Sequence, residues 1–196
     1  MNTLGWGVLC PEAMELIKMG ATQLSKPTYP TGNMQKEPHD KIVELIEDLM
    51  PKVLEELGQE SIDLGREKET DLLIHLEKDL YLCSYGKADL VYLVKNNAGI
   101  LEKNILLLYI EVSSTKINVA KPYQAILRGI SLYYRYHLPV AIVVVSPTKV
   151  CGKLLRNKDS NFIYKRIKRS VDDYFKPNPN LCSLCELSHF CPLRMI

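Results

Sequence analysis

Three cysteines close to the C-terminus have the spacing of a metal-thiolate site. They follow the pattern Cys182-x2-Cys185-x5-Cys191. Thiolates select zinc, copper(I) or iron-sulfur clusters, and a closed site needs a fourth ligand. That ligand is either His189, inside the loop, which would complete a zinc site, or Cys10, which like Cys191 precedes a proline. We therefore expect a metal site in this tail, with the metal itself left open by the spacing.

A second set of side chains has the chemistry of a hard-cation site. Asp89 follows Gly86 in the run GKAD, and Glu111 ends the most apolar run of the chain, ILLLYI. A carboxylate in such a run is costly to bury unless it is paired or binds a cation. His39 lies in the first turn of an expected helix. Together these oxygen and imidazole donors would suit magnesium or manganese, although each also has a structural reading as a helix-start, turn or ion-pair residue.

Such an ion polarises a phosphoryl oxygen and lowers the pKa of a bound water, which is the chemistry of phosphodiester hydrolysis. The charge pattern is compatible with a nucleic-acid partner. The net charge is only +2, but residues 37–79 carry fourteen acidic and five basic side chains, whereas residues 147–176 carry nine basic and three acidic ones. A basic flank supplies the salt-dependent part of nucleic-acid binding, although a solvated helix face would have the same composition.

The chain is long enough for one core. Its 196 residues, 46% of them hydrophobic, predict a single domain over 1–196. No basic, apolar leader opens the sequence, and the longest apolar runs are too short to span a bilayer. We therefore expect a soluble, cytoplasmic protein, and in a reducing compartment clustered cysteines bind metals rather than form disulfides. Cys83 and Cys151, next to β-rich runs, are expected to be buried small hydrophobes.

Helical and strand periods alternate along the chain. A short helix is expected around Met14, and a longer one from Pro38, kinked or interrupted at Pro51 and ending near Gly58. Four strands in a meander follow, at 72–77, 80–83, 88–94 and 105–114. A helix from Pro122 to about His137, a buried strand over 140–147 and a basic helix over 160–175 complete the pattern. Apolar residues expected on the inner side of the 122–137 helix are Ile126, Leu127, Ile130, Tyr133 and Tyr134.

The order of these motifs resembles a known nuclease family. His39, then GKAD with Asp89, then IEV with Glu111, then Gln124 resemble the RecB-like branch of the PD-(D/E)XK nucleases. With the added Cys-Pro near the N-terminus and the three tail cysteines, the chain looks like the iron-sulfur nucleases of the fourth CRISPR-associated family and their archaeal viral relatives. The resemblance runs from Cys10 to Cys191.

This resemblance implies a fold, two cofactors and an activity. The fold would be α/β, a restriction-endonuclease-like core with a central mixed sheet flanked by helices, and an iron-sulfur lobe formed by about 1–30 and 177–196. The catalytic Mg or Mn ion would be held by His39, Asp89, Glu111 and the Val112 carbonyl. An iron-sulfur cluster, 4Fe-4S in preference to 2Fe-2S, would be held by Cys10, Cys182, Cys185 and Cys191. The family degrades DNA from its ends, often single-stranded DNA with 5′ to 3′ polarity. It acts in CRISPR spacer acquisition with other adaptation proteins, and a viral relative would serve DNA recombination or replication.

Two departures from the family pattern bear on the chemistry. Ser113 stands where the family has a lysine that positions water and stabilises negative charge, and Arg128 stands where it has a tyrosine. We expect Lys116, just beyond the strand, to return an ammonium to the site on its flexible stem. Lys87 and Lys121 are less favoured substitutes. Arg128 is expected to serve DNA phosphate.

Three readings therefore compete. The leading one is an active metal-dependent exonuclease with Asp89, Glu111, Lys116 and Gln124 as its catalytic residues. The second is a catalytically impaired DNA-binding or adaptation-partner protein, which Ser113 favours. The third is a zinc-ribbon nucleic-acid binder that uses His189, and it ranks last because it leaves the carboxylates as structural groups.

Overall fold

The computed structural model describes residues 31–77, 80–84, 86–95, 105–115, 117 and 120–172. Several predictions fall outside these residues. They are the helix around Met14, the lobe over 1–30 and 177–196, Lys116, His189, and the cluster cysteines Cys10, Cys182, Cys185 and Cys191.

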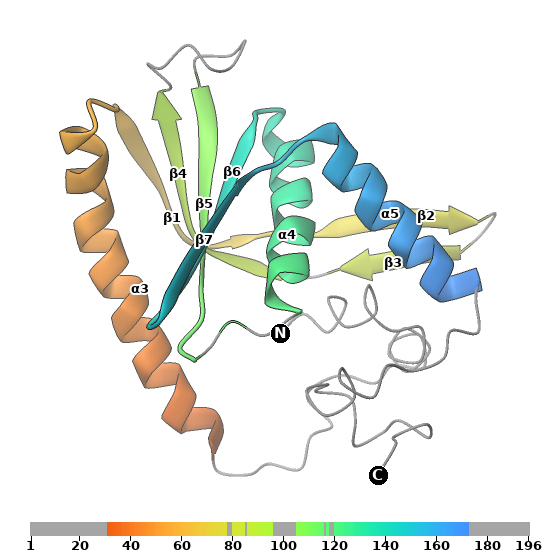
Figure 1. Ribbon diagram of the computed structural model, residues 1–196, viewed down its shortest axis with the longest axis horizontal. Coiled ribbons are helices and arrows are strands. Elements are labelled where there is room, and N and C mark those ends of the chain that lie inside the picture. The colour runs from red at the N-terminus through yellow and green to blue at the C-terminus, as the bar shows by residue number, and fades with distance from the viewer. Residues whose placement is uncertain are drawn as a thin grey trace.

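A five-stranded mixed sheet forms the centre of the described chain (Figure 1). Its order is β1 (Ser61–Glu69), β4 (Lys87–Lys95), β5 (Ile105–Val112), β6 (Val140–Ser146) and β7 (Lys149–Leu154). β5 and β6 are parallel, and the other neighbours are antiparallel. A parallel pair needs a crossover connection, and the helix α4 (Lys121–Tyr136) supplies it.

Helices cover both faces of this sheet, so the expected α/β architecture with a flanked mixed sheet is confirmed. α3 (Thr31–Glu56) packs Val43 and Leu54 against Leu90 and Ile110 on one face. α4 covers the opposite face (Figure 1). Beyond α4 lie α5 (Asn157–Asp172) and a separate hairpin made of β2 (Leu72–Glu77) and β3 (Leu80–Ser84).

The central strands are apolar throughout because both of their faces are buried. On β4, Val91 packs on the side of the sheet that α4 covers, and Leu90 packs on the side that α3 covers. On β5, Tyr109 packs on the α4 side and Ile110 on the α3 side. This double burial leaves Glu111, near the end of β5, with no exposed surface, so its charge needs partners inside the protein.

The structure corrects the predicted strand order. The four strands do not form one meander, because β2 and β3 leave the main sheet as their own hairpin. β1 and β7 were not expected at all. They are the two edge strands, and their sequences SIDLGREKE and KVCGKL carry charges and little apolar periodicity. Edge strands with charged side chains are common because one side of each faces solvent.

The helix predictions were right in kind and partly wrong in detail. α4 ends as expected, with His137 in a left-handed conformation at its C-cap, and α5 buries Ile163 and Ile167. α3 begins seven residues before Pro38 and continues through Pro51, both of which lie inside the helix. Tyr133 and Tyr134 were expected inside but are exposed.

Leu45 and Leu49 of α3 are exposed, because the side of this helix that faces the core passes through Val43 and Leu54. Cys151 is half-buried rather than enclosed. No helix among the described residues is both long and apolar enough to cross a membrane.

Candidate active site

Asp89 and Glu111 lie next to each other at one end of the central sheet. β4 and β5 are antiparallel with Leu90 opposite Ile110, so the two carboxylates stand one residue beyond that pair on neighbouring strands. The amide of Val112 donates a 2.6 Å hydrogen bond to Oδ2 of Asp89. The antiparallel pairing of β4 and β5 therefore brings the two acidic residues together in the described core.

His39 reaches Asp89 from α3. Its Nε2 lies 3.4 Å from Oδ2 of Asp89, and the two side chains are 30% and 15% exposed. The hydrogen bond with Asp89 raises the pKa of His39, against the opposing effect of burial. Burial would raise the pKa of Asp89, but His39, the Val112 amide and the charge of Lys121 outweigh burial and lower it. This pair therefore favours an ionised carboxylate with a cation beside it.

Glu111 is the most enclosed charge of the site. Its Oε2 accepts hydrogen bonds from the Tyr109 hydroxyl and from Nη1 of Arg128, the latter at 2.5 Å. Its Oε1 lies 2.5 Å from Nζ of Lys121. Two cationic groups thus offset one carboxylate that has no contact with solvent, which is the compensation that burial of a charge requires.

Arg128 is held in place by close packing around Gly86. Burial opposes its charge, but the neighbouring Glu111 carboxylate outweighs burial and raises the pKa of Arg128 further above its usual value. A Cβ at Gly86 would lie 3.0 Å from Nε of Arg128 and 3.3 Å from Oγ1 of Thr70. The glycine of the GKAD motif therefore leaves room for the guanidinium to reach Glu111.

The expected role of Arg128 as a DNA-phosphate contact is wrong for this structure. Arg128 is only 8% exposed, and its guanidinium pairs with Glu111. It lies on the buried side of α4, six residues after Pro122 at the helix start. The apolar β5 sequence could have indicated this pairing, because a buried glutamate in such a strand needs a fixed cation.

Lys121, a less favoured candidate in the sequence analysis, lies in the site. It is the first residue of α4, and its contact with Glu111 places an ammonium beside the carboxylates. Gln124, expected in the site, lies one helical turn later and is half-buried. Ser113 follows Glu111 by two residues, is half-buried, and donates its backbone amide to Val145. Lys87, the other candidate, pairs with Glu67 at 2.7 Å.

The donor set fits a divalent cation in part. His39 and Asp89 present an imidazole nitrogen and a carboxylate oxygen at 3.4 Å, close to the separation of neighbouring ligands around one small hard ion. Glu111 lies at the same end of the sheet, but its oxygens contact Lys121 and Arg128. Accordingly, no group of three His, Cys, Asp or Glu side chains within the described part of the chain is arranged to hold one ion.

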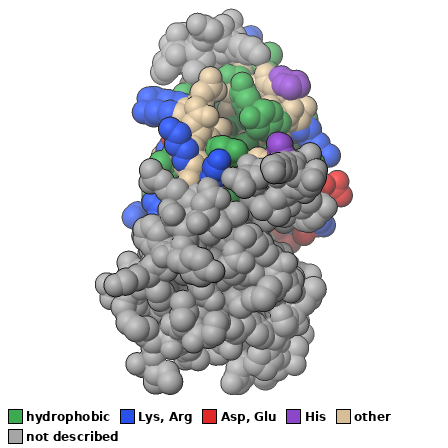
Figure 2. Space-filling view, turned by 90° about the vertical axis from the view of Figure 1, so that its right-hand side faces the viewer, with side chains coloured by type: hydrophobic (Ala, Val, Ile, Leu, Met, Phe, Trp, Pro, Cys, Tyr) green, Lys and Arg blue, Asp and Glu red, His purple; other side chains and the backbone are tan. Residues whose placement is uncertain are grey.

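A basic face extends along α5, as the charge pattern predicted. The guanidinium of Arg166 lies 5.9 Å from the Tyr123 ring centroid and 5.7 Å from that of Phe162. Figure 2 shows hydrophobic side chains on the described part of this side of the molecule, with Lys and Arg side chains around them. Cationic and aromatic groups side by side are typical of surfaces that bind single-stranded nucleic acid.

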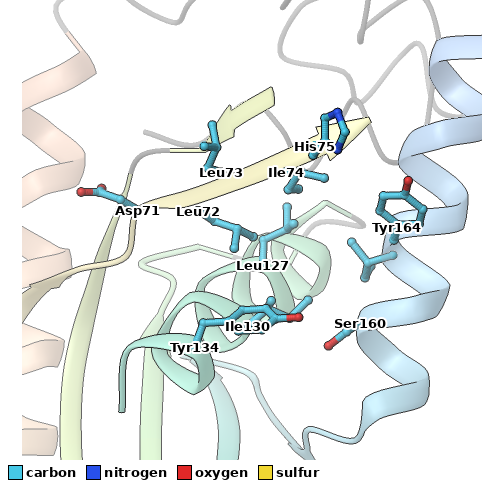
Figure 3. A pocket seen from close by; sticks show the side chains of 11 residues that line it. Asp71, Leu72, Leu73, Ile74, His75, Leu127, Ile130, Tyr134, Ser160 and Tyr164 are labelled. Carbon is cyan, nitrogen blue, oxygen red and sulfur yellow. The ribbon is translucent and has the colours of Figure 1, made fainter. Parts of the chain in front are cut away.

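A hollow of about 430 Å³ lies between β2, α4 and α5 (Figure 3). Apolar side chains form most of its wall, with Asp71, His75 and Ser160 as polar members and the rings of Tyr134 and Tyr164 at its sides. It contains none of the predicted catalytic residues. The candidate active site is therefore separate from this hollow.

No protein-family model matches the chain, and no characterised protein matches its sequence. The crystal structure of SSO0001 is similar over 97% of this chain and 85% of the other, with a TM-score of 0.48 and 15% sequence identity.

Proposed function

We propose that this protein is a Mg- or Mn-dependent deoxyribonuclease that degrades single-stranded DNA from its ends, with 5′ to 3′ polarity. The observation that carries the proposal is the meeting of His39, Asp89 and Glu111 at one end of the sheet with the Lys121 ammonium among them. The resemblance in motif order to the RecB-like nucleases supports the same reading. The basic face of α5 supports a nucleic-acid substrate.

The residues have separate tasks in this proposal. His39, Asp89 and Glu111, with the Val112 carbonyl, would hold the ion, which when bound polarises the phosphodiester and activates water. The Val112 amide fixes Asp89, because it donates to the same carboxylate that His39 approaches. Gln124 would position the DNA from the first turn of α4. Lys116, the predicted source of the ammonium, lies outside the described residues and stays a prediction.

An iron-sulfur cluster would complete the protein. Four cysteines, Cys10, Cys182, Cys185 and Cys191, are proposed as its ligands, with 4Fe-4S favoured over 2Fe-2S. The cluster would join the chain ends beside the basic helix α5, so its loss should weaken DNA binding more than it affects the metal site. We propose roles in CRISPR spacer acquisition or in viral DNA recombination.

One observation favours the second candidate, a catalytically impaired DNA-binding or adaptation-partner protein. Both oxygens of Glu111 contact cationic side chains, and Arg128 is a permanent cation that cannot yield its place by losing a proton. If these contacts persist, Glu111 is a structural anchor and the ion has only His39 and Asp89. The chain would then bind DNA and not cut it.

A cleavage assay with a binding arm separates the two candidates. Labelled single-stranded DNA is incubated with manganese and the wild type, Asp89→Ala, or the control Asp48→Asn, an exposed carboxylate nine residues after His39 on α3. The proposal expects shortened products from the wild type and the control but not from Asp89→Ala, with DNA retained by all three. DNA retained without cleavage by the wild type supports the impaired protein. Equal products from Asp89→Ala would identify a contaminant and remove the nuclease proposal.

A further inference from the structure

Lys121 differs from the other ion-paired lysines of the described chain in its surroundings. Lys41, Lys87, Lys95 and Lys153 pair with carboxylates while their own side chains stay 48–70% exposed. Lys121 is 20% exposed, and its partner Glu111 is fully buried. Its charge adds to the effects of His39 and the Val112 amide that lower the pKa of Asp89, and it opposes the rise that Asp89 causes in the pKa of His39. One ammonium thus acts on all three residues that are proposed to hold the ion.

The contacts of Glu111 leave Lys121 room to act on a substrate. Oε2 is held by Arg128 and Tyr109, while Lys121 approaches Oε1 on the other side. The carboxylate therefore keeps a cation and a hydroxyl donor if Lys121 turns toward another anion. Lysine is suited to this because it carries a compact charge on a flexible four-carbon stem, and the side chain is not sealed from solvent.

We propose that Lys121 is a catalytic residue of this site, whose ammonium contacts a non-bridging oxygen of the scissile phosphodiester. This inference rests on the proposed nuclease function. In the hydrolysis, the water oxygen forms a bond to phosphorus, and the bond to the leaving sugar oxygen breaks with its electron pair. The water loses one proton to solvent and the leaving oxygen gains one, which yields a phosphomonoester and an alcohol. Lys121 stays protonated and stabilises the negative charge that develops on the phosphoryl oxygens.

In this role, Lys121 supplies from a helix the positive charge that the resembled family carries on its strand. β5 ends at Val112 and offers Ser113 at the position where the family carries its lysine, and a hydroxyl supplies no positive charge. α4 begins at Lys121 after the connection from β5, and Pro122 sets the start of that helix. The beginning of the helix thus fixes the lysine backbone beside the end of the strand that carries Glu111.

The test compares three lysines in one single-turnover assay. Lys121→Met, Lys116→Met and the matched control Lys87→Met, whose lysine pairs with Glu67 away from the carboxylates, are measured at saturating manganese and single-stranded DNA. We expect Lys121→Met to lose about 10²- to 10³-fold in rate, the usual effect of removing one charge-stabilising donor, and Lys87→Met to keep the wild-type rate. The half-saturating manganese concentration of Lys121→Met should stay within about threefold of the wild-type value. A lysine that only supported Glu111 would change this concentration and leave the saturated rate unchanged.

Each outcome decides a different claim. A full rate in Lys121→Met overturns the inference and leaves the nuclease standing, and a loss confined to Lys116→Met does the same and moves the role to Lys116. A wild type that does not cut overturns the nuclease and this inference together. Lys121→Gln, which keeps a neutral donor at the position, is measured in parallel, and the rate is judged on whichever variant retains the wild-type circular dichroism. A weakened manganese dependence with an unchanged saturated rate would assign Lys121 a purely structural role.

Discussion

The ion pair between Arg128 and Glu111 predicts a large and specific loss of stability. Arg128→Met keeps much of the apolar stem but removes the guanidinium from a carboxylate that has no solvent contact. Removing one partner of a buried pair costs about 3–5 kcal/mol. Because Lys121 and Tyr109 still contact Glu111, the lower end applies, and we expect a loss of about 3 kcal/mol in the free energy of unfolding.

Urea denaturation at neutral pH measures this loss directly, as a shift of the midpoint at constant slope. Arg135→Met is the matched control on the same helix, because Arg135 is exposed and donates one hydrogen bond to the Glu69 carbonyl. It should cost less than about 1 kcal/mol. The double variant that combines Arg128→Met with Glu111→Gln should lose less free energy of unfolding than the sum of the two single-variant losses. We expect the difference to be at least about 1 kcal/mol. A loss below about 1 kcal/mol for Arg128→Met alone would refute the buried pair.

Three further predictions follow from the same region. Gly86→Ala should cost about 1–2 kcal/mol by urea unfolding, because its Cβ would crowd the paired Arg128 guanidinium; an unchanged midpoint would contradict that packing. Asp89 raises the pKa of His39 above 6.5. In the presence of a chelator, this pair should therefore stabilise the fold fully below about pH 6.5, and its contribution should fall as the pH rises through the pKa that His39 has in the folded protein. Asp89→Asn should remove that pH dependence. Anaerobically purified protein should be brown and contain iron, and Cys182→Ser should lose both, whereas a colourless zinc protein would support the ligand His189.

The sequence was sufficient for the central strands and for the carboxylate pair. Double burial of β4 and β5 leaves continuous apolar runs, so Asp89 and Glu111 stand out against their surroundings. β1 and β7 were missed because the sheet edges that they occupy do not require an apolar pattern. β1 pairs with β4, which follows it only after the β2–β3 hairpin, and local periodicity does not record that pairing.

The partners of Glu111 were beyond sequence reasoning for a related physical reason. Lys121 was less favoured than Lys116, which lies closer to the strand in sequence, but the start of α4 places the Lys121 ammonium beside Glu111. Arg128 was assigned to DNA phosphate because it stands where the resembled nuclease family has a tyrosine. Its burial follows from the demand of Glu111 for a counter-charge, and that demand is visible only once α4 is placed on the sheet.

The most direct test of the central claim is the single-turnover rate of single-stranded DNA degradation in manganese, measured with 5′-labelled and 3′-labelled strands. The nuclease account predicts stepwise shortening from the 5′ end by the wild type, abolished by chelator and by Asp89→Ala, and retained in Asp48→Asn. Intact DNA in all reactions, with wild-type binding, would contradict the account and leave a DNA-binding protein whose Glu111 serves the fold.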